Sequence, residues 1–548
     1  MFGLPSGALI LLAVSALVVF GVTERVLDRM RLSDGAALLI LAALIAGMFL
    51  PAVRVAPTIA VDLGGAVVPA AIAIYLIATA GTNRERVRAI VAALVTGAAV
   101  YAFERFIPGE PGMRGLPFDI DPIWYPGIIA AIVGYTAGRS RRSAFIAGTM
   151  GVVLADLAAG ISNALAGRTG SLVVIGGAGA VDSVIIGGVL AVVLAEAFGE
   201  LREYLAGGPS RERPRELVRG LSNEDSARSG ERAGPRARRP NRAAGVAAAL
   251  ALVLTLGLIG RLTLRGEARE GTIYQIVDRT GRVITSIGMQ VVRGDRYLDT
   301  DNTLYRIYAV KGTNAWAAST GVVDLKAAAA VFAAGATAGF PRGAAQSVAT
   351  AAAGAFQPVN IGIYFTHNDE SYVPDQGVAN VDSGPGGVHN VGHAFADRLR
   401  EDGQVPVVSD AEHYPHDAGA YRRSRPTLME LLKWLPAAVF DVHRDAGPGD
   451  MYAAYINNQW VTQVRLVVGR QNQNVSQNTA FAMSLKDLAD QMYPGLVKGI
   501  FFAHGNYNQD LFPRALLIEV GTEQNSQDAA EGGIRMFADV VARIFGSK

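Results

Sequence analysis

The sequence predicts a multi-span α-helical membrane domain followed by an extracellular α/β domain, in which helices flank a mixed sheet, with a small β unit between them. Hydrophobic residues make up 50% of the 548 residues and charged residues 18%, a balance too apolar for an ordinary soluble enzyme. All seven histidines lie between His367 and His504, so we expect the chemistry in the last third of the chain. Cysteine is absent, which excludes disulfides, thiolate zinc sites and cysteine nucleophiles.

Apolar runs long enough to cross a bilayer dominate the first half, since a span needs roughly 20 residues. Arginine-rich and arginine-poor loops alternate between these runs, and the rich loops are expected to face the cytoplasm. The N-terminus and everything after Leu264 are therefore predicted to lie outside. The first run has no basic residues before it, so we interpret it as a retained span. The predicted spans are, approximately, 5–23, 35–53, 58–80, 87–103, 121–138, 143–166, 171–199 and 243–262.

The composition divides the chain into parts of different character. The stretch 201–242 carries eleven arginines among Pro, Gly and Ser, which is typical of a disordered tether and could also hold it against anionic lipid. The predicted parts are a seven-span membrane domain (1–200), a basic cytoplasmic linker (201–242), an eighth transmembrane helix (243–264), a small extracellular β unit (265–325), an Ala/Gly-rich linker (326–357) and a catalytic domain (358–548).

Acidic residues inside predicted spans are costly and are candidates for a transport or relay role. Asp62, Asp156 and Asp182 lie in three of the predicted spans. The alternative interpretation places them near a membrane interface, where they need no such role.

Two patterns predict the outer half. The run "TIYQIVDRTGRVITSIG" alternates apolar and polar residues around a turn, which indicates β structure. From about residue 358, strand-like and helix-like patterns alternate, which indicates an α/β sheet. The strand candidates are "VNIGIYF", "VPVVSD", "AVFDVH", "RLVVG" and "RALLIEVG", and the helix candidates are 388–401, 426–434, 475–492 and 528–545.

Polar side chains follow three of these strands, where reactive groups collect in α/β sheets. His367 and Glu370 follow the first strand, His443 ends "AVFDVH", and Glu519 lies near the end of "RALLIEVG". Two histidines and a carboxylate can hold a catalytic Zn²⁺ that leaves one position open to water. A further carboxylate then moves the proton. We predict His367, Glu370 and His443 as metal ligands and Glu519 as the base. Taken alone, an H-x-x-E pair is more often a loop pair without metal.

The other polar residues near these strand ends have more than one interpretation. Asp441 or Asp445 could orient an imidazole. His389 and His393 have an i, i+4 spacing that can bind metal, but one face of an amphipathic helix explains them equally well. His389 is the best substitute ligand if Glu370 is not one. His413 and His416 lie in the loop "EHYPHD", which could border the site. For these two, as for His389 and His393, an ordinary structural role is the favoured interpretation, and His504 could be a substrate contact.

Seven blocks follow one another in the last third of the chain: "THNDESY", "VHNVGHAFADRL", "YRRSRPTL", "FDVHRDA", "VVGRQNQN", "YPGLVKGIFF" and "YNQDLFPRALLIEVGTEQNS". Together they resemble the stage II sporulation protein P family, whose members are cell-wall hydrolases of spore-forming bacteria. The resemblance covers about residues 358–548, and the stretch 58–200 resembles an uncharacterised family of multi-spanning bacterial proteins. The sporulation family is similar to zinc-dependent N-acetylmuramoyl-L-alanine amidases, and its pattern implies the same His367, His443, Glu370 and Glu519.

The resemblance implies an amidase-like sheet and an attack by a zinc-activated water on the amide that joins muramic acid to L-alanine. Arg444 is then expected to bind the oxyanion or a stem-peptide carboxylate, and Tyr507 and Asn508 to hold the stem peptide. The implied partners are peptidoglycan, membrane lipid and sporulation cell-wall proteins. The net charge of +2 gives no case for a nucleic-acid partner.

Two other functions fit the same residues. A zinc carboxypeptidase would use the same four side chains to cut a terminal peptide bond of the stem. A membrane transporter or sensor would need only an outer domain that binds wall fragments. The sequence alone leaves open the role of the membrane region and whether glycan strands are also cleaved.

Overall fold

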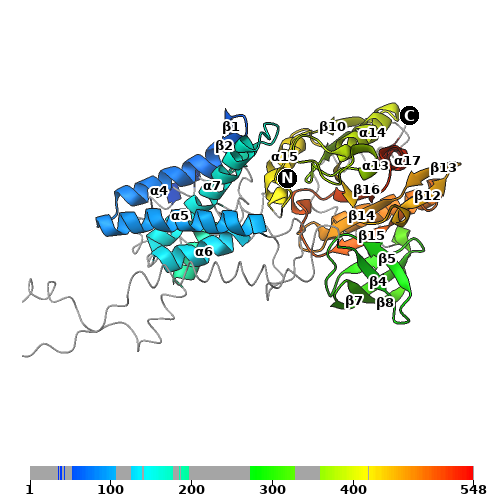
Figure 1. Cartoon of the computed structure of the whole chain (residues 1–548), viewed down its shortest axis with the longest axis horizontal. Helices are drawn as coiled ribbons and strands as arrows, with labels where there is room; N and C mark the ends of the chain where they lie inside the picture. Colours follow the sequence, from blue (N-terminus) through cyan, green and yellow to red (C-terminus); the bar gives the residue numbers. More distant parts are fainter. Residues whose placement is uncertain are drawn as a thin grey trace, which may run out of the picture.

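The computed structural model describes residues 52–106, 125–138, 141–176, 187–196, 272–327, 358–417 and 419–546, with a few isolated positions besides (Figure 1). The predicted first span, the basic linker at 201–242, the eighth span at 243–264 and nearly all of the Ala/Gly-rich linker at 326–357 lie outside the described residues. The division of the chain into the six predicted parts stays a prediction.

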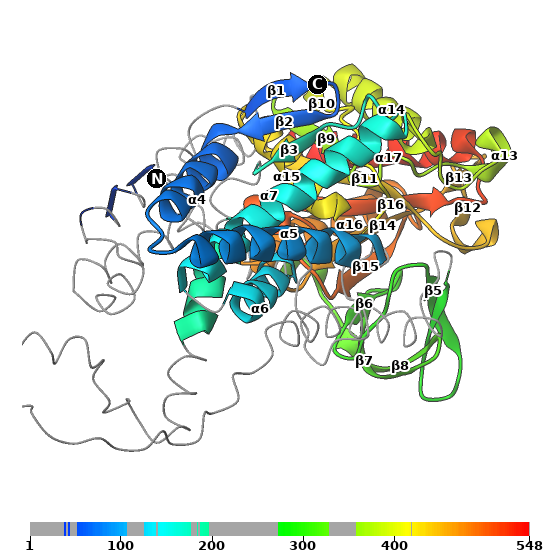
Figure 2. The same ribbon diagram turned by 60° about the vertical axis from the view of Figure 1, so that its left-hand side comes forward.

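Apolar helices make up most of the N-terminal region, and three of them, α5 (Asn83–Phe106), α6 (Tyr125–Gly138) and α7 (Arg141–Leu165), pack side by side (Figure 2). A Cβ atom at Gly151 of α7 would lie 2.4 Å from Cγ2 of Thr96 on α5, so glycine is needed for this close approach. Among the described residues, two helices are long and apolar enough to cross a bilayer, Asn83–Arg105 and Arg142–Leu165.

Two predicted spans are not continuous helices, which corrects the sequence-based expectation. The predicted span 58–80 begins with a strand, and so does the predicted span 171–199. Hydropathy marks an apolar run but does not separate a buried strand from a helix, and the β-branched residues here favour the strand. The strands that pair in this small sheet are β1 (Ala52–Ala56), β2 (Ile59–Asp62) and β3 (Val173–Ile175), and the helical part that follows β2 consists of η1 (Leu63–Val67) and α4 (Val68–Ala78).

The acids of the predicted spans have structural partners where they are described. The Asp62 carboxylate accepts a hydrogen bond from Gly65 N at 2.6 Å and so caps η1. Asp156 is buried on α7 and pairs with Arg422 of the C-terminal region. Asp182 lies outside the described residues.

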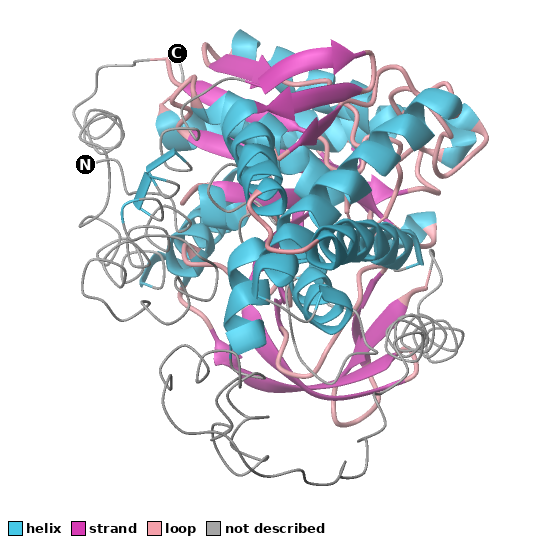
Figure 3. Cartoon of the chain, turned by 90° about the vertical axis from the view of Figure 1, so that its left-hand side faces the viewer, coloured by secondary structure: helices cyan, strands magenta, loops and turns pink. Residues whose placement is uncertain are grey.

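A mixed sheet with helices on both faces forms the C-terminal region, as the sequence predicted (Figures 1 and 3). Its neighbouring strands follow the order β10-β9-β11-β16-β14-β15. The first four run parallel, and β14 is antiparallel to β16. The strands are β9 (Asn360–Tyr364), β10 (Val405–Val408), β11 (Ala438–Asp445), β14 (Val464–Gly469), β15 (Val497–Ala503) and β16 (Ala515–Thr522).

The helices bury apolar side chains against both faces of this sheet. On one face α14 (Gly387–Glu401), α16 (Val475–Met492) and α17 (Gln527–Phe545) enclose a core that contains Phe395 and Phe440. On the other face lies α15 (Ala420–Leu432). The sequence predicted that this helix begins at Pro426, but it begins at Ala420. Its first turns contain three arginines and a serine, so apolar spacing does not mark them as part of the helix.

The strands expected in the β unit are present, but they do not stand apart from the α/β domain. β6 pairs antiparallel with β15, so the strands of the β unit and the six strands of the α/β domain form one eleven-stranded sheet. A Cβ atom at Gly499 of β15 would lie 2.3 Å from Leu298 O, and glycine therefore permits this junction. The unit contains β4 (Tyr274–Val277), β5 (Val283–Ile287), β6 (Arg296–Leu298), β7 (Thr303–Lys311) and β8 (Asn314–Val322). Shorter elements near the sheet are α13 (Val373–Gln376), η4 (Gly449–Met451), β12 (Ala453–Ile456), β13 (Gln459–Thr462) and η5 (Gln509–Leu511).

Candidate metal centre

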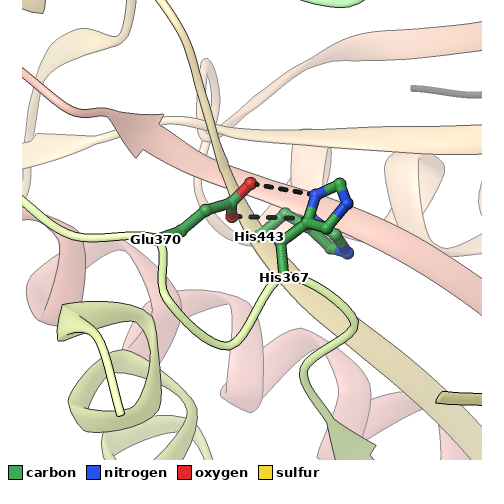
Figure 4. Close-up of side chains that lie close together, drawn as sticks. All are labelled: His367, Glu370 and His443. Atoms are coloured by element: carbon green, nitrogen blue, oxygen red, sulfur yellow. Dashed lines mark ion pairs between the residues drawn. The ribbon is translucent and has the colours of Figure 1, made fainter. Parts of the chain in front are cut away.

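Two histidines and a glutamate converge at the carboxyl edge of the sheet (Figure 4). One nitrogen of His367, one nitrogen of His443 and one carboxylate oxygen of Glu370 all lie within 4.8 Å of one another. Nδ1 of His367 is 3.3 Å from Oε1 of Glu370, and Nδ1 of His443 is 3.5 Å from Oε2. All three side chains are buried. The three predicted ligands are thus brought together, and we refer to them as the ligand cluster.

The backbone explains why these residues meet. His367 follows β9, and a turn in which Glu370 N donates to His367 O at 3.2 Å carries Glu370 back towards the sheet. His443 lies on β11, which is the parallel neighbour of β9. Because the carboxyl ends of parallel strands share one edge of a sheet, a loop after β9 and the end of β11 must lie close together.

The Asp441 carboxylate contacts both His443 and the loop that carries His367. Its Oδ1 lies 3.1 Å from Nε2 of His443. The same carboxylate accepts hydrogen bonds from the backbone N–H and the hydroxyl of Thr366, at 2.8 and 2.6 Å, and so fixes the start of the loop that carries His367. Of the two aspartates predicted for this task, Asp441 is the one that lies beside an imidazole. Asp445 instead accepts a hydrogen bond from Tyr452 and pairs with Arg465.

Glu519 lies beside the ligand cluster on the adjacent strand. It is the register partner of His443 across the parallel pair β11 and β16, so both side chains point to the same face of the sheet. Its side chain is buried, and on its other side it is the register partner of Arg465 on β14. A buried carboxylate between a histidine ligand and an arginine suits the predicted general base.

The charges in the cluster depend on one another. Burial lowers the pKa of His367 to about 4, and the electrostatic interaction with the neighbouring His416 acts in the same direction. Burial also opposes a charged Glu370, but His443, His367 and Arg444 outweigh it and hold the pKa of Glu370 well below its usual value. For His443, burial is outweighed by Asp441 and Glu370, which raise its pKa well above the usual value. A metal ion would therefore replace a proton on His443.

Arg444 has partners within the protein. Its backbone N–H donates to Oε2 of Glu370 at 3.0 Å. Its guanidinium donates to Ala379 O at 2.9 Å and to Oδ1 of Asn380 at 2.7 Å. These contacts hold the carboxylate ligand and the loop beyond it.

Tyr507 and Asn508, the predicted contacts of the stem peptide, contact Tyr421 rather than the predicted ligands themselves. Both adopt left-handed backbone conformations, with φ of 55° and 57°. The Tyr507 hydroxyl donates to His504 O at 3.1 Å, and its ring packs edge-on against Tyr421. The Asn508 amide donates to Tyr421 O at 2.8 Å and to Ser424 Oγ at 3.1 Å, so it supports α15.

The substitute ligand His389 is not in the cluster. Its Nδ1 lies 3.1 Å from Oδ1 of Asp410, the atom that His393 Nε2 approaches to 2.9 Å, and its ring stacks on Phe365. His413 is also structural: Nδ1 lies 2.7 Å from Phe365 O, and burial lowers its pKa to about 4.

Two residues outside the predicted ligand set line the ligand cluster. His416 belongs to the loop that the sequence pattern placed near the site, whereas Tyr421 was not singled out. The ring of His416 stacks on that of His367 with centroids 4.0 Å apart, and its Nδ1 lies 3.0 Å from Asp369. The Tyr421 ring lies 5.4 Å from His367 and 6.3 Å from His443. His416 lies in the segment between β10 and α15, and Tyr421 lies in the first turn of α15. Tyr421 neither ends a strand nor belongs to a ligand spacing, so strand-end reasoning could not find it.

The side chains present fit a zinc ion. Two imidazoles and one carboxylate are the donors of a catalytic zinc site, and their buried polar atoms already converge. His443 has Asp441 beside its other ring nitrogen, which is the kind of partner that orients metal-bound histidines.

Two stretches of the chain match families of known proteins. Residues 344–542 match the family model described as stage II sporulation protein P (SpoIIP). Residues 10–194 match a different family, described as protein of unknown function (DUF1614). Among curated proteins, the stage II sporulation protein P of Bacillus subtilis (strain 168) is 31% identical over 202 residues, which cover 33% of this chain.

The chain matches about half the length of this curated relative, because the aligned part covers 50% of it. The resemblance that the sequence blocks indicated is confirmed. Residues 344–542 form a SpoIIP family domain, and the N-terminal region is a separate one that matches a family of unknown function.

Proposed function

We propose that this chain is a membrane-anchored peptidoglycan hydrolase, a zinc-dependent N-acetylmuramoyl-L-alanine amidase that acts in sporulation-associated wall remodelling. The convergence of His367, Glu370 and His443 beside the buried Glu519 carries this proposal. The match to the SpoIIP family supports a role in the sporulation cell wall.

In this proposal His367, Glu370 and His443 hold the metal. A zinc ion there supplies polarisation of the scissile carbonyl and of the water that attacks it. Glu519 accepts a proton from that water as its oxygen bonds to the lactyl carbonyl carbon. The carbon–nitrogen bond then breaks, and Glu519 passes the proton to the nitrogen of the leaving L-alanine. Arg444 is a positioning residue, because its N–H holds Glu370 and its guanidinium holds the adjoining loop.

Substrate contacts follow from the same geometry. Tyr507 and Asn508 support the wall of the site through Tyr421, so they are expected to affect stem-peptide binding through that ring. Peptidoglycan is the proposed substrate, anionic lipid is a proposed partner of the basic stretch 201–242, and sporulation cell-wall proteins are further proposed partners.

The contacts between the two regions support an outer location for the SpoIIP domain. Arg84, Arg86 and Arg88 lie in the first turns of α5, and Arg142 lies at the start of α7, so these ends are expected to face the cytoplasm. The SpoIIP domain contacts the other ends, at Glu104 of α5 and Asn163 of α7. Peptidoglycan lies on that outer side.

The test uses the full chain in detergent or liposomes. We expect the purified protein to contain zinc, and we expect a chelator to stop the digestion of peptidoglycan. Released disaccharide with an intact stem peptide identifies an amidase, whereas a released terminal amino acid identifies a carboxypeptidase and contradicts the proposed bond.

A matched pair of variants tests the base. Glu519→Gln is expected to keep the metal and to lose activity by about 10²- to 10⁴-fold, as for loss of a general acid–base group. Glu401→Gln, on the exposed side of α14, is the control. If Glu519→Gln digests the wall at the full rate, Glu519 is not the base and the proposed mechanism fails.

A further inference from the structure

The SpoIIP domain is joined to the N-terminal helices by a buried ionic contact. The guanidinium of Arg422, on α15, lies between carboxylates from two different helices. It donates to Glu104 of α5 at 3.1 and 3.0 Å, and it also pairs with Asp156 of α7. The side chains of Arg422 and Glu104 are each 10% exposed, and that of Asp156 is 2% exposed. Charges buried in this way depend on one another, since removal of one leaves the others without compensation.

Further contacts, in the last turn of α7 and just beyond it, extend this ionic contact. Asn163 Nδ2 donates to Tyr414 O at 3.1 Å. Arg168 Nε donates to Asp382 O at 2.8 Å, and its guanidinium lies 4.9 Å from the centre of the Tyr414 ring. Ser171 forms a β-bridge with Glu412. The N-terminal helices therefore contact the SpoIIP domain over a surface and not at a single point.

The surface contacted on the SpoIIP domain is the segment that lines the ligand cluster. We call residues 411–417 and 419–422 the rim segment. Its outer side carries the atoms that the N-terminal helices bind, on Glu412, Tyr414 and Arg422. Its inner side carries His416 and Tyr421, whose rings pack on the ligand His367.

The ligand cluster is closed when this contact is made. The side chains of His367, Glu370 and His443 are 0%, 5% and 2% exposed, and Glu519 is 3% exposed. A strand of peptidoglycan cannot bring its amide to side chains so covered. Some part of the covering must therefore move before the proposed reaction, and the rim segment is the part of that covering that a second region holds.

We propose that the N-terminal helical region is a built-in restraint on the SpoIIP domain: docked on the rim segment, it keeps the site closed, and release of the Arg422 contact opens it. This inference rests on the proposed hydrolase function. Because Glu104 and Asp156 come from different helices, a relative shift of α5 and α7 separates the two carboxylates that Arg422 requires. The helices can in this way pass a change in the membrane region to the site.

The chain has no cysteine, so an engineered pair gives a clean test of docking. Ser171→Cys and Glu412→Cys are combined in the full chain in liposomes, because their bridge brings the two backbones together. We expect a disulfide on mild oxidation, a fall in peptidoglycan digestion of about tenfold or more, within the usual range of coupling between sites, and recovery on reduction. Each single variant, oxidised in the same way, is the control.

The outcomes separate this proposal from the proposed function. Failure to form the disulfide shows that the docked state is not adopted, and a disulfide without loss of digestion shows that docking is no restraint; either result overturns the inference. If the single variants and the reduced pair also fail to digest peptidoglycan, the hydrolase function itself fails and the inference that rests on it falls too. The yield of the disulfide still reports docking in that case.

A second set of variants breaks the contact instead of locking it. Arg422→Gln is expected to raise the rate of digestion about tenfold. Glu104→Gln combined with Asp156→Asn should raise it to the same extent, and the three changes together should add nothing further. Arg400→Gln, at an exposed position of α14, is the control. A gain in rate cannot come from misfolding, whereas an unchanged or reduced rate in both sets of variants contradicts the restraint.

Discussion

The ligand cluster and the group formed by His389, His393 and Asp410 contain the same kinds of side chain in different surroundings. The ligand cluster is buried, with its atoms converging from two neighbouring strand ends. In the second group the side chains of His393 and Asp410 are 46% and 54% exposed, and both histidines share one oxygen of Asp410. Two imidazoles and a carboxylate therefore do not define a metal site by themselves; burial and orientation by further groups do.

The backbone explains the difference. In the second group the histidines are one turn apart on the single helix α14, and Asp410 follows β10 at the edge of the sheet. In the ligand cluster, β9 and β11 lie inside the sheet, where neighbouring strands exclude water on both sides. A rigid sheet interior can hold ligands in one geometry, whereas exposed side chains lose little by remaining hydrated.

The largest difference between the two groups, in metal binding and in peptidoglycan digestion, is expected when a histidine of each is substituted. His443→Ala should abolish metal binding and peptidoglycan digestion, because two remaining ligands do not hold a catalytic zinc ion. His393→Ala should leave both within about twofold, since its exposed imidazole lies beside Asp410 and away from the ligand cluster. Metal content by elemental analysis and product release from purified peptidoglycan measure the two effects.

His367→Ala and His389→Ala repeat the experiment at buried positions. His389 is itself buried, so a loss of fold would affect both variants alike. If His389→Ala loses metal as completely as His367→Ala while its thermal unfolding is unchanged, the second group is the metal site and the contrast is reversed.

The next largest difference is expected when the carboxylate beside each pair of histidines is substituted. Asp441→Asn removes the negative charge behind His443 and is expected to lower zinc affinity by about 10- to 100-fold, the usual effect of an orienting partner. Asp410→Asn should not change zinc affinity. Competition with a chromophoric chelator gives both constants. Equal effects of the two substitutions would mean that neither carboxylate orients a ligand.

Zinc uptake should depend on pH through His443. The metal-free protein holds a proton on His443, because Asp441 and Glu370 raise its pKa well above the usual value, and zinc binds only the neutral ring. Binding thus releases this proton, and affinity is expected to fall about tenfold for each unit by which pH drops below that pKa. Calorimetry in buffers of different ionisation enthalpy counts the protons released.

The variant Asp441→Asn provides the control for the proton count. Without the adjacent carboxylate the pKa of His443 should fall, and the number of protons released at neutral pH should fall with it. A release that does not change between the two proteins would assign the proton to another group.

The sequence was sufficient to predict the ligand cluster because strand ends are visible in it. Apolar runs that stop at His367, at His443 and after Glu519 locate the polar groups on one edge of the sheet. Their meeting then follows from parallel pairing.

What the sequence could not predict are contacts between elements far apart in the chain. Arg422 meets Glu104 and Asp156 across more than 260 residues, and no local pattern indicates such a pair. The junction of β6 with β15 was missed for a similar reason: β15 was not among the predicted strands, and its partner β6 lies far from it in the chain. The strands at 59–62 and 173–175 were hidden because a buried strand and a spanning helix are both apolar.

The smallest expected effect concerns stability at the second group. Asp410→Ala removes the shared partner of His389 and His393, and the pKa of Asp410 is lowered chiefly by its hydrogen bond with His389. Because more than half of the Asp410 side chain is exposed, solvent screens this interaction, and the free energy of unfolding should fall by less than about 1 kcal/mol. Denaturant unfolding of the full chain measures the change, with Asp397→Ala on the exposed side of α14 as the control. A loss several times larger than that of the control would show that the second group, although exposed, holds α14 to the edge of the sheet.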